Sequence, residues 1–341
     1  MAPQFNRRQV LKHAVTLSVL SALPLALQAE ILSRPAPRSS FDEDSTAEEV
    51  TEGIDLSGKT IAITGANSGL GYETMRVLAL RGAHVIGIAR NQDKADKACA
   101  SIDGETTAMF LDLAEWDSVV ACAERIKALG QPLDGLITNA GIMSLPELQL
   151  VNGYERQFAI NHLGHFILIN QLRDAVLAAP EGRFTILSSL AHKQAENGIE
   201  FDNLDGSNHY DGWQAYGVSK LANALCAREL AQQISDTHAT ANSLHPGVIN
   251  TNLGRHMSPW KQTVANYLGW IFMKTIPEGA ATTCYVATSP ELRGVRGYYF
   301  ADCNVGEGAR YLTDDAMAKK LWRVSTEATG DYLPDGHPQP S

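Results

Sequence analysis

The sequence predicts one doubly wound α/β domain that spans about residues 58–330. Two observations predict it. Short runs rich in β-branched residues alternate with segments of helical length, and these runs are apolar almost throughout. Such strands are buried on both faces, as in a parallel sheet covered by helices on both sides. About seven parallel strands are expected, within residues 59–65, 84–90, 107–113, 133–141, 182–189, 240–246 and 297–303.

The composition excludes several classes of protein. Hydrophobic residues make up 44% of the 341, and 28 Gly and 14 Pro fit a globular α/β chain. The formal net charge of −10 argues against nucleic acid or an anionic membrane as the main partner. The 5 cysteines are scattered without a CxxC pair, so we expect buried thiols and no metal site.

The N-terminal stretch NRRQVLKHAVTLSVLSALPLALQAE has the features of an export signal. Arg7 and Arg8 precede an apolar core over 14–27 that is too short to span a bilayer comfortably. The pattern resembles the twin-arginine signal of bacteria, with possible cleavage after Ala29. The expectation is a signal peptide over 1–29, recognition by export machinery and a periplasmic protein. The alternatives are an uncleaved membrane anchor and a wrongly assigned start.

Two further segments flank the expected domain. Residues 30–57 mix Pro, Ser and clustered acids with little apolar periodicity, which predicts a flexible acidic linker. Residues 331–341 are expected to form a short C-terminal tail. No later stretch approaches 18 uninterrupted apolar residues, so no transmembrane span is expected in the mature protein.

The first expected strand runs into the glycine-rich sequence TGANSGLGYE. Gly65, Gly69 and Gly71 fall between a strand and a helix, where glycine lets the backbone turn sharply and lets a pyrophosphate approach the helix N-terminus. The alternative is an ordinary tight turn. The pattern therefore favours a dinucleotide as cofactor.

The end of the second expected strand bears on which dinucleotide is bound. Folds that bind NAD place a carboxylate there, and this sequence has Ala89 and Arg90 instead. A guanidinium suits a 2′-phosphate, so NADP (NADPH) is favoured over NAD. The alternatives are that Arg90 stacks on adenine or faces solvent.

The segment AYGVSKLANAL contains a candidate proton-transfer pair. Tyr216 and Lys220 are four residues apart, so they lie on one face of a helix. A phenol has a pKa near 10, and a neighbouring ammonium group is expected to lower it. The pair is thus suited to general acid/base chemistry.

Four features together resemble the short-chain dehydrogenase/reductase family, which has a Rossmann fold. They are the glycine pattern, NAG at 139–141, TILSS ending at Ser189, and the Tyr216/Lys220 pair. The resemblance implies four catalytic roles. Ser189 would hydrogen-bond the substrate oxygen, Tyr216 would move the proton, Lys220 would grip the nicotinamide ribose, and Asn161 would hold a water in the proton relay. Ser188 is expected to bond the backbone or pack, and His245 to pack at a strand end.

The resemblance also implies a set of cofactor contacts. Asp112 would contact the adenine amino group, although an isolated Asp is often a helix cap, and Thr251 would bond the nicotinamide carboxamide. The full set expected to bind the cofactor is Gly65, Asn67, Ser68, Gly69, Leu70, Gly71, Arg90, Asp112, Leu113, Asn139, Ala140, Gly141, Tyr216, Lys220 and Thr251.

Four features narrow the resemblance to the branch of retinol dehydrogenases and WW-containing oxidoreductase. There are 26 residues between Ser189 and Tyr216, and the chain contains the stretches NHLGHF, LHPGVINTNL and PEGAATTCYVATSPELRGVRGYYFADC. After the sixth strand, residues 252–279 include Trp260, Tyr267 and Trp270, so a lid over a lipophilic substrate is expected. The same side chains could instead pack on the sheet or in an oligomer interface.

The sequence thus predicts an NADP(H)-dependent alcohol dehydrogenase or carbonyl reductase of a lipophilic small molecule. Its partners would be a carbonyl or alcohol substrate and a second copy of the chain in a homodimer or homotetramer. The alternative is a catalytically silent NADP(H)-binding sensor or partner-binding module.

Overall fold

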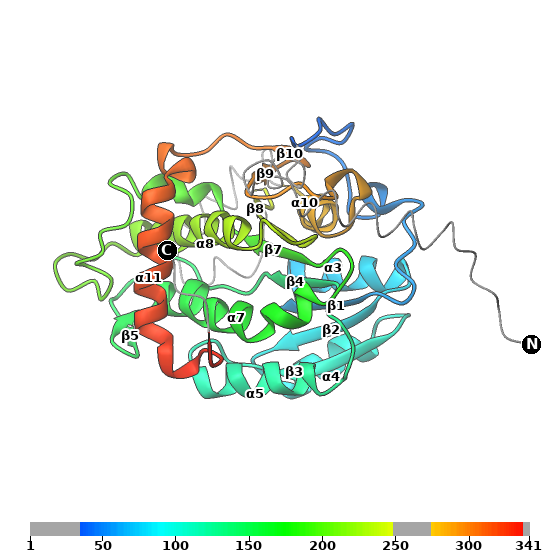
Figure 1. The fold of residues 1–341 in the computed structure, drawn as a ribbon, viewed down its shortest axis with the longest axis horizontal. Coiled ribbons are helices and arrows are strands. Elements are labelled where there is room, and N and C mark those ends of the chain that lie inside the picture. The colour runs from blue at the N-terminus through cyan, green and yellow to red at the C-terminus, as the bar shows by residue number, and fades with distance from the viewer. Residues whose placement is uncertain (1–34, 248–273, 337–341) are drawn as a thin grey trace, which may run out of the picture.

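The computed structural model describes residues 35–247 and 274–336. In these residues a central sheet lies between two layers of helices (Figure 1). The sheet has 8 strands in the order β10-β9-β8-β7-β4-β1-β2-β3. Its strands are β1 (Thr60–Thr64), β2 (His84–Ala89), β3 (Thr106–Phe110), β4 (Gly135–Thr138), β7 (Arg183–Leu187), β8 (Thr240–His245), β9 (Tyr299–Ala301) and β10 (Asn304–Val305).

The predicted parallel strands are confirmed. Every neighbouring pair from β9 to β3 is parallel, and only β10 runs antiparallel, against β9. β10 is the part of this sheet that the sequence pattern did not predict. A small second sheet pairs β5 (Leu150–Val151) with β6 (Tyr154–Glu155).

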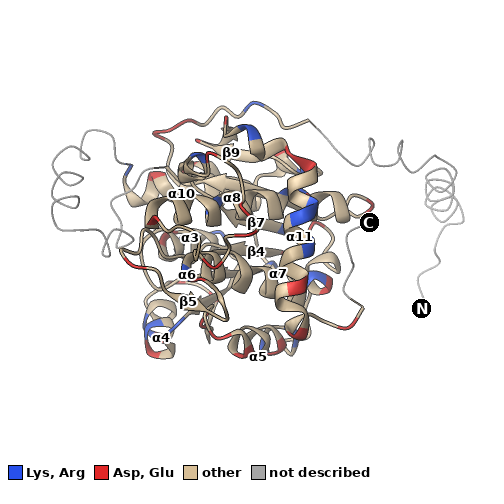
Figure 2. Ribbon diagram, turned by 90° about the vertical axis from the view of Figure 1, so that its left-hand side faces the viewer, with Lys and Arg blue, Asp and Glu red and all other residues tan. Residues whose placement is uncertain are grey.

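The sheet separates two apolar cores, and helices cover each core on its outer side. On one face, α3 (Gly69–Leu80), α4 (Gln92–Ala100) and α10 (Ile276–Thr288) enclose the core that contains Met75 and Phe300. On the other face, α5 (Trp116–Lys127), α7 (Gly164–Leu177) and α8 (Gly212–Gln233) enclose the core that contains Phe166. α11 (Asp315–Thr329) packs against α8, and both signs of charge occur along it (Figure 2).

The remaining helical elements are short. They are η1 (Glu49–Thr51), α6 (Arg156–Phe158), the π-helical η2 (Ala159–Leu163), η3 (Leu190–Gln194), η5 (Pro290–Leu292), η6 (Arg310–Thr313) and η7 (Gly330–Tyr332). The π-helix leads directly into α7 and contains Asn161. Such wide turns occur often at functional sites.

The strand order fixes where a ligand can enter. From β1 the chain proceeds to β2 and β3 on one side, and it then crosses back to β4 on the other side of β1. The crossovers on the two sides of this switch point diverge, which leaves a crevice at the carboxyl ends of the strands. The predicted site residues after β1, β2, β4 and β7 all lie at that edge.

Residues 35–57, here called the N-terminal strap, differ from the flexible linker that the sequence predicted. Ala47, Val50 and Thr51 are buried in the structure. The amide of Ala47 donates to the carbonyl of Pro277 at 2.9 Å, which joins the strap to α10. The acidic composition concealed a few apolar residues, and these pack on the core between α3 and α10.

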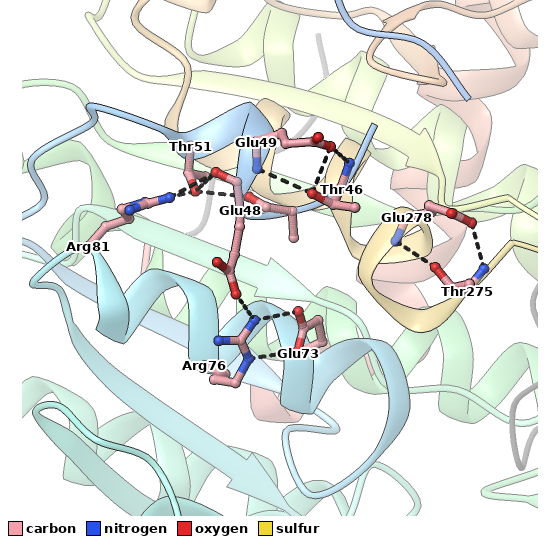
Figure 3. Close-up of polar contacts among 10 residues, drawn as sticks. Thr46, Glu48, Glu49, Thr51, Glu73, Arg76, Arg81, Thr275 and Glu278 are labelled. Carbon is pink, nitrogen blue, oxygen red and sulfur yellow. Dashed lines mark hydrogen bonds and ion pairs between the residues drawn. The ribbon is translucent and has the colours of Figure 1, made fainter. Parts of the chain in front are cut away.

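Polar contacts attach the strap to α3 and its C-cap (Figure 3). Arg81 donates to the Glu48 carbonyl at 2.8 Å and to the Thr51 hydroxyl at 3.0 Å. Arg76 pairs with Glu48 at 2.6 Å and with Glu73 at 2.8 Å. The strap's acidic residues are therefore partly used in fixed contacts rather than left in solvent.

The predicted ends of the chain are described only in part. Residues 1–29, the expected signal peptide, lie outside the described residues. Of the expected C-terminal tail, Tyr332 packs edge-on against Trp116 with ring centroids 5.4 Å apart. Within residues 35–247 and 274–336, no helix combines the length and apolar character needed to cross a bilayer.

Ala47→Asp tests whether the strap is part of the folded domain. The side chain at Ala47 is fully buried, so the variant buries an unpaired carboxylate and should lose about 3 kcal/mol or more of unfolding free energy. Ser40→Asp adds the same charge at an exposed position of the strap and should change little. Equal urea midpoints for the two variants would show that the strap does not contribute to stability.

Candidate active site

A cleft of about 470 Å³ opens at the carboxyl edge of the sheet, beside β1, β2 and β4. It is lined by all the predicted cofactor residues that the structure describes. These are Gly65, Asn67, Ser68, Gly69, Leu70, Gly71, Arg90, Asp112, Leu113, Asn139, Ala140, Gly141, Tyr216 and Lys220. Thr251 lies outside the described residues, as do the aromatic residues of the expected lid.

The glycine-rich turn has the geometry that only glycine tolerates well. Gly65 and Gly69 have φ of +73° and +57°, in the left-handed region. A Cβ on Gly71 would lie 2.3 Å from the carbonyl oxygen of Gly65. The turn and the first residues of α3 are thus packed backbone to backbone, and no side-chain hydrogen bond from Ser68 caps the helix. Its first amides are available to an anion.

Thr64, at the end of β1, joins this turn to the end of β4. Its hydroxyl oxygen accepts from the amides of Asn139 and Ala140, each at 3.0 Å. The side-chain amide of Asn139 donates back to the Thr64 carbonyl at 2.7 Å. The NAG sequence therefore forms the floor of the cleft through bonds to β1.

The far end of the cleft, beside β2, is basic. Arg90, Asn91 and Lys94 line it, and Asn91 caps α4 by accepting from the amide of Lys94 at 3.0 Å. Lys94 was not among the predicted site residues, although it follows Arg90 by only four residues. Asp112 also lines the cleft, and it accepts from the Ala114 amide at 2.9 Å, so it makes the local turn as well.

Tyr216 and Lys220 lie on α8, whose first turn is capped by Asp211 through the amides of Trp213 and Gln214. Both side chains are buried. The Lys220 Nζ lies 5.8 Å from the centroid of the Tyr216 ring and donates to the Leu187 carbonyl at 3.2 Å. The helix thus presents the phenol and the ammonium group side by side at the inner end of the cleft.

The pKa values of this pair differ from the expectation. Burial raises the pKa of Tyr216 to about 12, and a hydrogen bond with the Ser189 side chain acts in the opposite direction. Burial lowers the pKa of Lys220 to about 8. The expected lowering of the phenol pKa by Lys220 is absent from this state, because loss of solvation disfavours both charged forms and the ammonium bonds a backbone carbonyl.

Asn161 is held by contacts to protein groups. Its side chain is fully buried, and both of its amide protons are used in these contacts. Its Oδ1 accepts from the Ile142 amide at 2.8 Å, and its Nδ2 donates to the Ile142 carbonyl and to the Ser219 hydroxyl, each at 2.9 Å. The side chain therefore holds the segment that follows β4 against α8.

The serine pair divides its roles. The Ser188 hydroxyl donates to the Lys220 carbonyl at 2.7 Å, as expected of a backbone-bonding serine. Ser189 is partly exposed, and its hydroxyl caps η3 by accepting from the Ala191 amide at 3.2 Å. His245 lies at the end of β8 and accepts from the Leu190 amide at 3.3 Å, in keeping with a strand-end packing role.

The cysteines contribute no chemistry to this site. Cys99, Cys122, Cys226, Cys284 and Cys303 are all free and buried, as predicted. Burial raises the pKa of each thiol. In the described part of the chain no three His, Cys, Asp or Glu side chains form a group that could hold a metal ion.

Comparison with known proteins places these residues in context. A family profile described as short chain dehydrogenase matches residues 59–262. A chloroplastic short-chain dehydrogenase, TIC 32 B of Brassica napus, is 42% identical over 312 residues, covering 88% of this chain and 97% of the relative. A crystal structure of a Mycobacterium Paratuberculosis protein is 32% identical, with a TM-score of 0.67, and covers 84% of this chain and 98% of that one.

The two proteins named for the predicted branch are also among the relatives. Retinol dehydrogenase 14 of Homo sapiens is 39% identical over 295 residues, covering 81% of this chain and 87% of the relative. WW domain-containing oxidoreductase of Homo sapiens is 37% identical over 313 residues, covering 88% of this chain and 75% of the relative.

The predicted periplasmic location is wrong in the light of these relatives. They include chloroplastic enzymes of Brassica napus and proteins of Homo sapiens, rather than exported bacterial proteins. A short apolar run behind two arginines was therefore too general a pattern to assign a compartment.

Gly71→Ala tests the backbone packing of the cleft. The new Cβ would meet the Gly65 carbonyl at 2.3 Å, so the turn must open and NADPH binding should weaken at least about tenfold. Gly330→Ala is the control, since nothing lies within 4 Å of its Cβ and its backbone is helical. NADPH fluorescence titration measures both. Unchanged binding by Gly71→Ala would place the dinucleotide elsewhere.

Proposed function

The chain belongs to the short-chain dehydrogenase family, and we propose from this premise that it is an NADP(H)-dependent oxidoreductase that interconverts an alcohol and a carbonyl. The observation that carries the proposal is that Tyr216 and Lys220 line a glycine-cradled cleft side by side, with the Ser189 side chain next to Tyr216. The substrate is proposed to be a lipophilic small molecule.

The residues present fit a dinucleotide. A Cβ at Gly71 would fill the place where the backbone turns most tightly, and the amides at the start of α3 suit a pyrophosphate. The cleft volume of about 470 Å³ falls within the usual range for cofactor sites. When bound, the nicotinamide would supply or accept the hydride, and the protein would supply orientation and a proton.

Tyr216 is proposed to be the general acid in reduction. Because burial raises its pKa to about 12, the phenol keeps its proton through the neutral range and can donate it to a developing alkoxide. The Ser189 side chain offsets part of the rise in the Tyr216 pKa, and its hydroxyl would donate to the same substrate oxygen. Trp213 stacks on Tyr216 at 5.7 Å between centroids, and the Tyr216 side chain is buried.

Lys220 is proposed to position and to tune this proton transfer. Because its pKa is about 8, the side chain is mostly protonated at pH 7, and Lys220 lines the cleft. From this position it would hold the nicotinamide ribose and stabilise a phenolate when one forms.

The preference for NADP over NAD is proposed from the positive charge of the cleft beside β2. Arg90 and Lys94 line the cleft beside β2, where an NAD-specific fold would place a carboxylate. Two cations at this position suit a 2′-phosphate through charge-assisted hydrogen bonds. Asn91, the N-cap of α4, also lines this part of the cleft. The positive end of the α4 dipole therefore favours an anion at the same place.

The substrate class is proposed from apolar side chains near the phenol. Leu190, which follows Ser189, and Trp213 are exposed large hydrophobic residues. The human relative is named for retinol, a lipophilic alcohol, and it shares 39% of its aligned residues with this chain. Apolar aldehydes and ketones are therefore the first substrates to test.

Tyr216→Phe should reduce kcat for such a carbonyl by roughly 10²- to 10⁴-fold and leave NADPH affinity intact. In the reverse direction the wild-type enzyme needs the phenolate, so alcohol oxidation should rise about tenfold per pH unit below the Tyr216 pKa. Tyr72→Phe, which removes a surface hydroxyl bonded to Ser101, is the matched control. Tight NADPH binding without turnover by the wild type would favour the silent binding module.

Arg90→Ala should weaken NADPH binding roughly tenfold to a hundredfold, since a charge-assisted bond is lost, and should leave NADH binding nearly unchanged. Lys94→Ala should shift the ratio of the two affinities in the same direction. Arg125→Ala removes an exposed arginine on α5 and serves as the control. Equal losses for both cofactors in Arg90→Ala would support adenine stacking instead.

A further inference from the structure

His165 is a buried imidazole that the proposed chemistry does not use. It is the second residue of α7 and is 2% exposed. Its ring nitrogens have two partners: Nε2 lies 2.9 Å from the Thr64 hydroxyl, and Nδ1 lies 3.0 Å from the carbonyl oxygen of Asn161. The first partner precedes the glycine-rich turn, and the second lies in the π-helix η2.

The hydrogen-bond partners determine where each proton lies. Thr64 accepts from the Asn139 and Ala140 amides, which can only donate, so the single proton of its hydroxyl is left for His165 Nε2. Nε2 must therefore be an acceptor, and the ring proton is on Nδ1. There it donates to the Asn161 carbonyl, which can only accept. The ring is therefore neutral. Burial lowers the pKa of His165 to about 4, which agrees with a neutral ring at pH 7.

These bonds continue to the catalytic tyrosine. The Asn161 side chain donates to the Ser219 hydroxyl at 2.9 Å, and Ser219 donates to the Tyr216 carbonyl at 2.7 Å. One hydrogen-bonded series thus connects the end of β1, through His165 and Asn161, to the backbone of α8. The series has a defined donor and acceptor at every step, so it favours one relative placement of its members.

We propose that His165 is a positioning residue that fixes the glycine-rich cofactor turn relative to the helix that carries Tyr216 and Lys220. The inference rests on the proposed function, because it assigns the effect to the dinucleotide site. His165 does not line the cofactor cleft and does not contact the reacting atoms. It acts through its hydrogen bonds to Thr64 and Asn161.

The same motif supplies a matched control. His162 is 1% exposed and precedes His165 by one turn, but its Nε2 bonds the hydroxyl of Ser325 in α11 at 2.8 Å. His162→Phe and His165→Phe therefore make the same chemical change at equally buried positions. Only the second change breaks a bond to β1.

The experiment measures the NADPH Kd, kcat and the melting temperature for both variants. His165→Phe should weaken NADPH binding and lower kcat roughly tenfold to a hundredfold, as expected of a misplaced site. His162→Phe should lower the melting temperature to a similar degree and leave the Kd within about twofold. His165→Gln, whose amide oxygen can accept from Thr64, should recover part of the affinity.

Equal Kd values for the two Phe variants, or no recovery with Gln, would overturn the proposal and leave His165 a packing residue. A double-mutant cycle with Thr64→Val, read by urea denaturation, tests the bridge without any cofactor. The losses of Thr64→Val and His165→Phe should be less than additive, and additive losses would show that no bridge exists. This stability measurement tests the bridge without reference to the cofactor. Failure of the proposed function would instead show as no dinucleotide binding by the wild type.

Discussion

The hydroxyl of Thr64 is the contact on which the arrangement of the cleft depends. β1 lies between β2 and β4 at the point where the strand order reverses, so its carboxyl end must meet the ends of both neighbours. β4 is short, and the amides that follow it have no strand partner of their own. Thr64 accepts from both of these amides, which keeps the NAG sequence against the glycine-rich turn. Without that junction the crevice between diverging crossovers would have no defined floor.

The motif NHLGHF, which served only as a mark of resemblance in the sequence, has a separate physical task at each polar or small position. Asn161 binds both backbone groups of Ile142, and His162 reaches α11. Gly164 allows close contact, because a Cβ there would lie 2.6 Å from the Leu113 carbonyl beside the cleft. His165 then reaches β1. The π-helical turn allows these side chains to point to different elements within one short segment.

The sequence predicted strands well wherever apolar residues run without interruption, because such runs have few alternatives to a buried parallel sheet. The predicted third strand ended too late. Leu111 and Leu113 follow β3, and they are buried because they border the cleft and not because they belong to the strand. The sequence pattern missed β10 because the turn before it has positive φ at Asp302 and Cys303, and the second of these positions carries Cys where a hairpin usually has Gly. The site residues were found through local motifs. The position of Lys94, the contacts of the buried Asn161 side chain and the raised Tyr216 pKa depend on tertiary structure that no motif encodes.

The N-terminal strap shows how composition can misplace a domain boundary. Counting acids and prolines put the start of the domain near residue 58, yet the amide of Ser39 already donates to the Asn304 side chain of β10 at 2.9 Å. Asn304 in turn donates to the Phe41 carbonyl at 2.8 Å, so the edge strand and the strap fix each other. The strap then reaches α3, which begins at the cofactor turn, and α10. Because these two helices pack together and the strap bonds to both, it belongs to the same cooperative unit as the cleft. The contacts of the folded domain therefore extend back at least to Ser39.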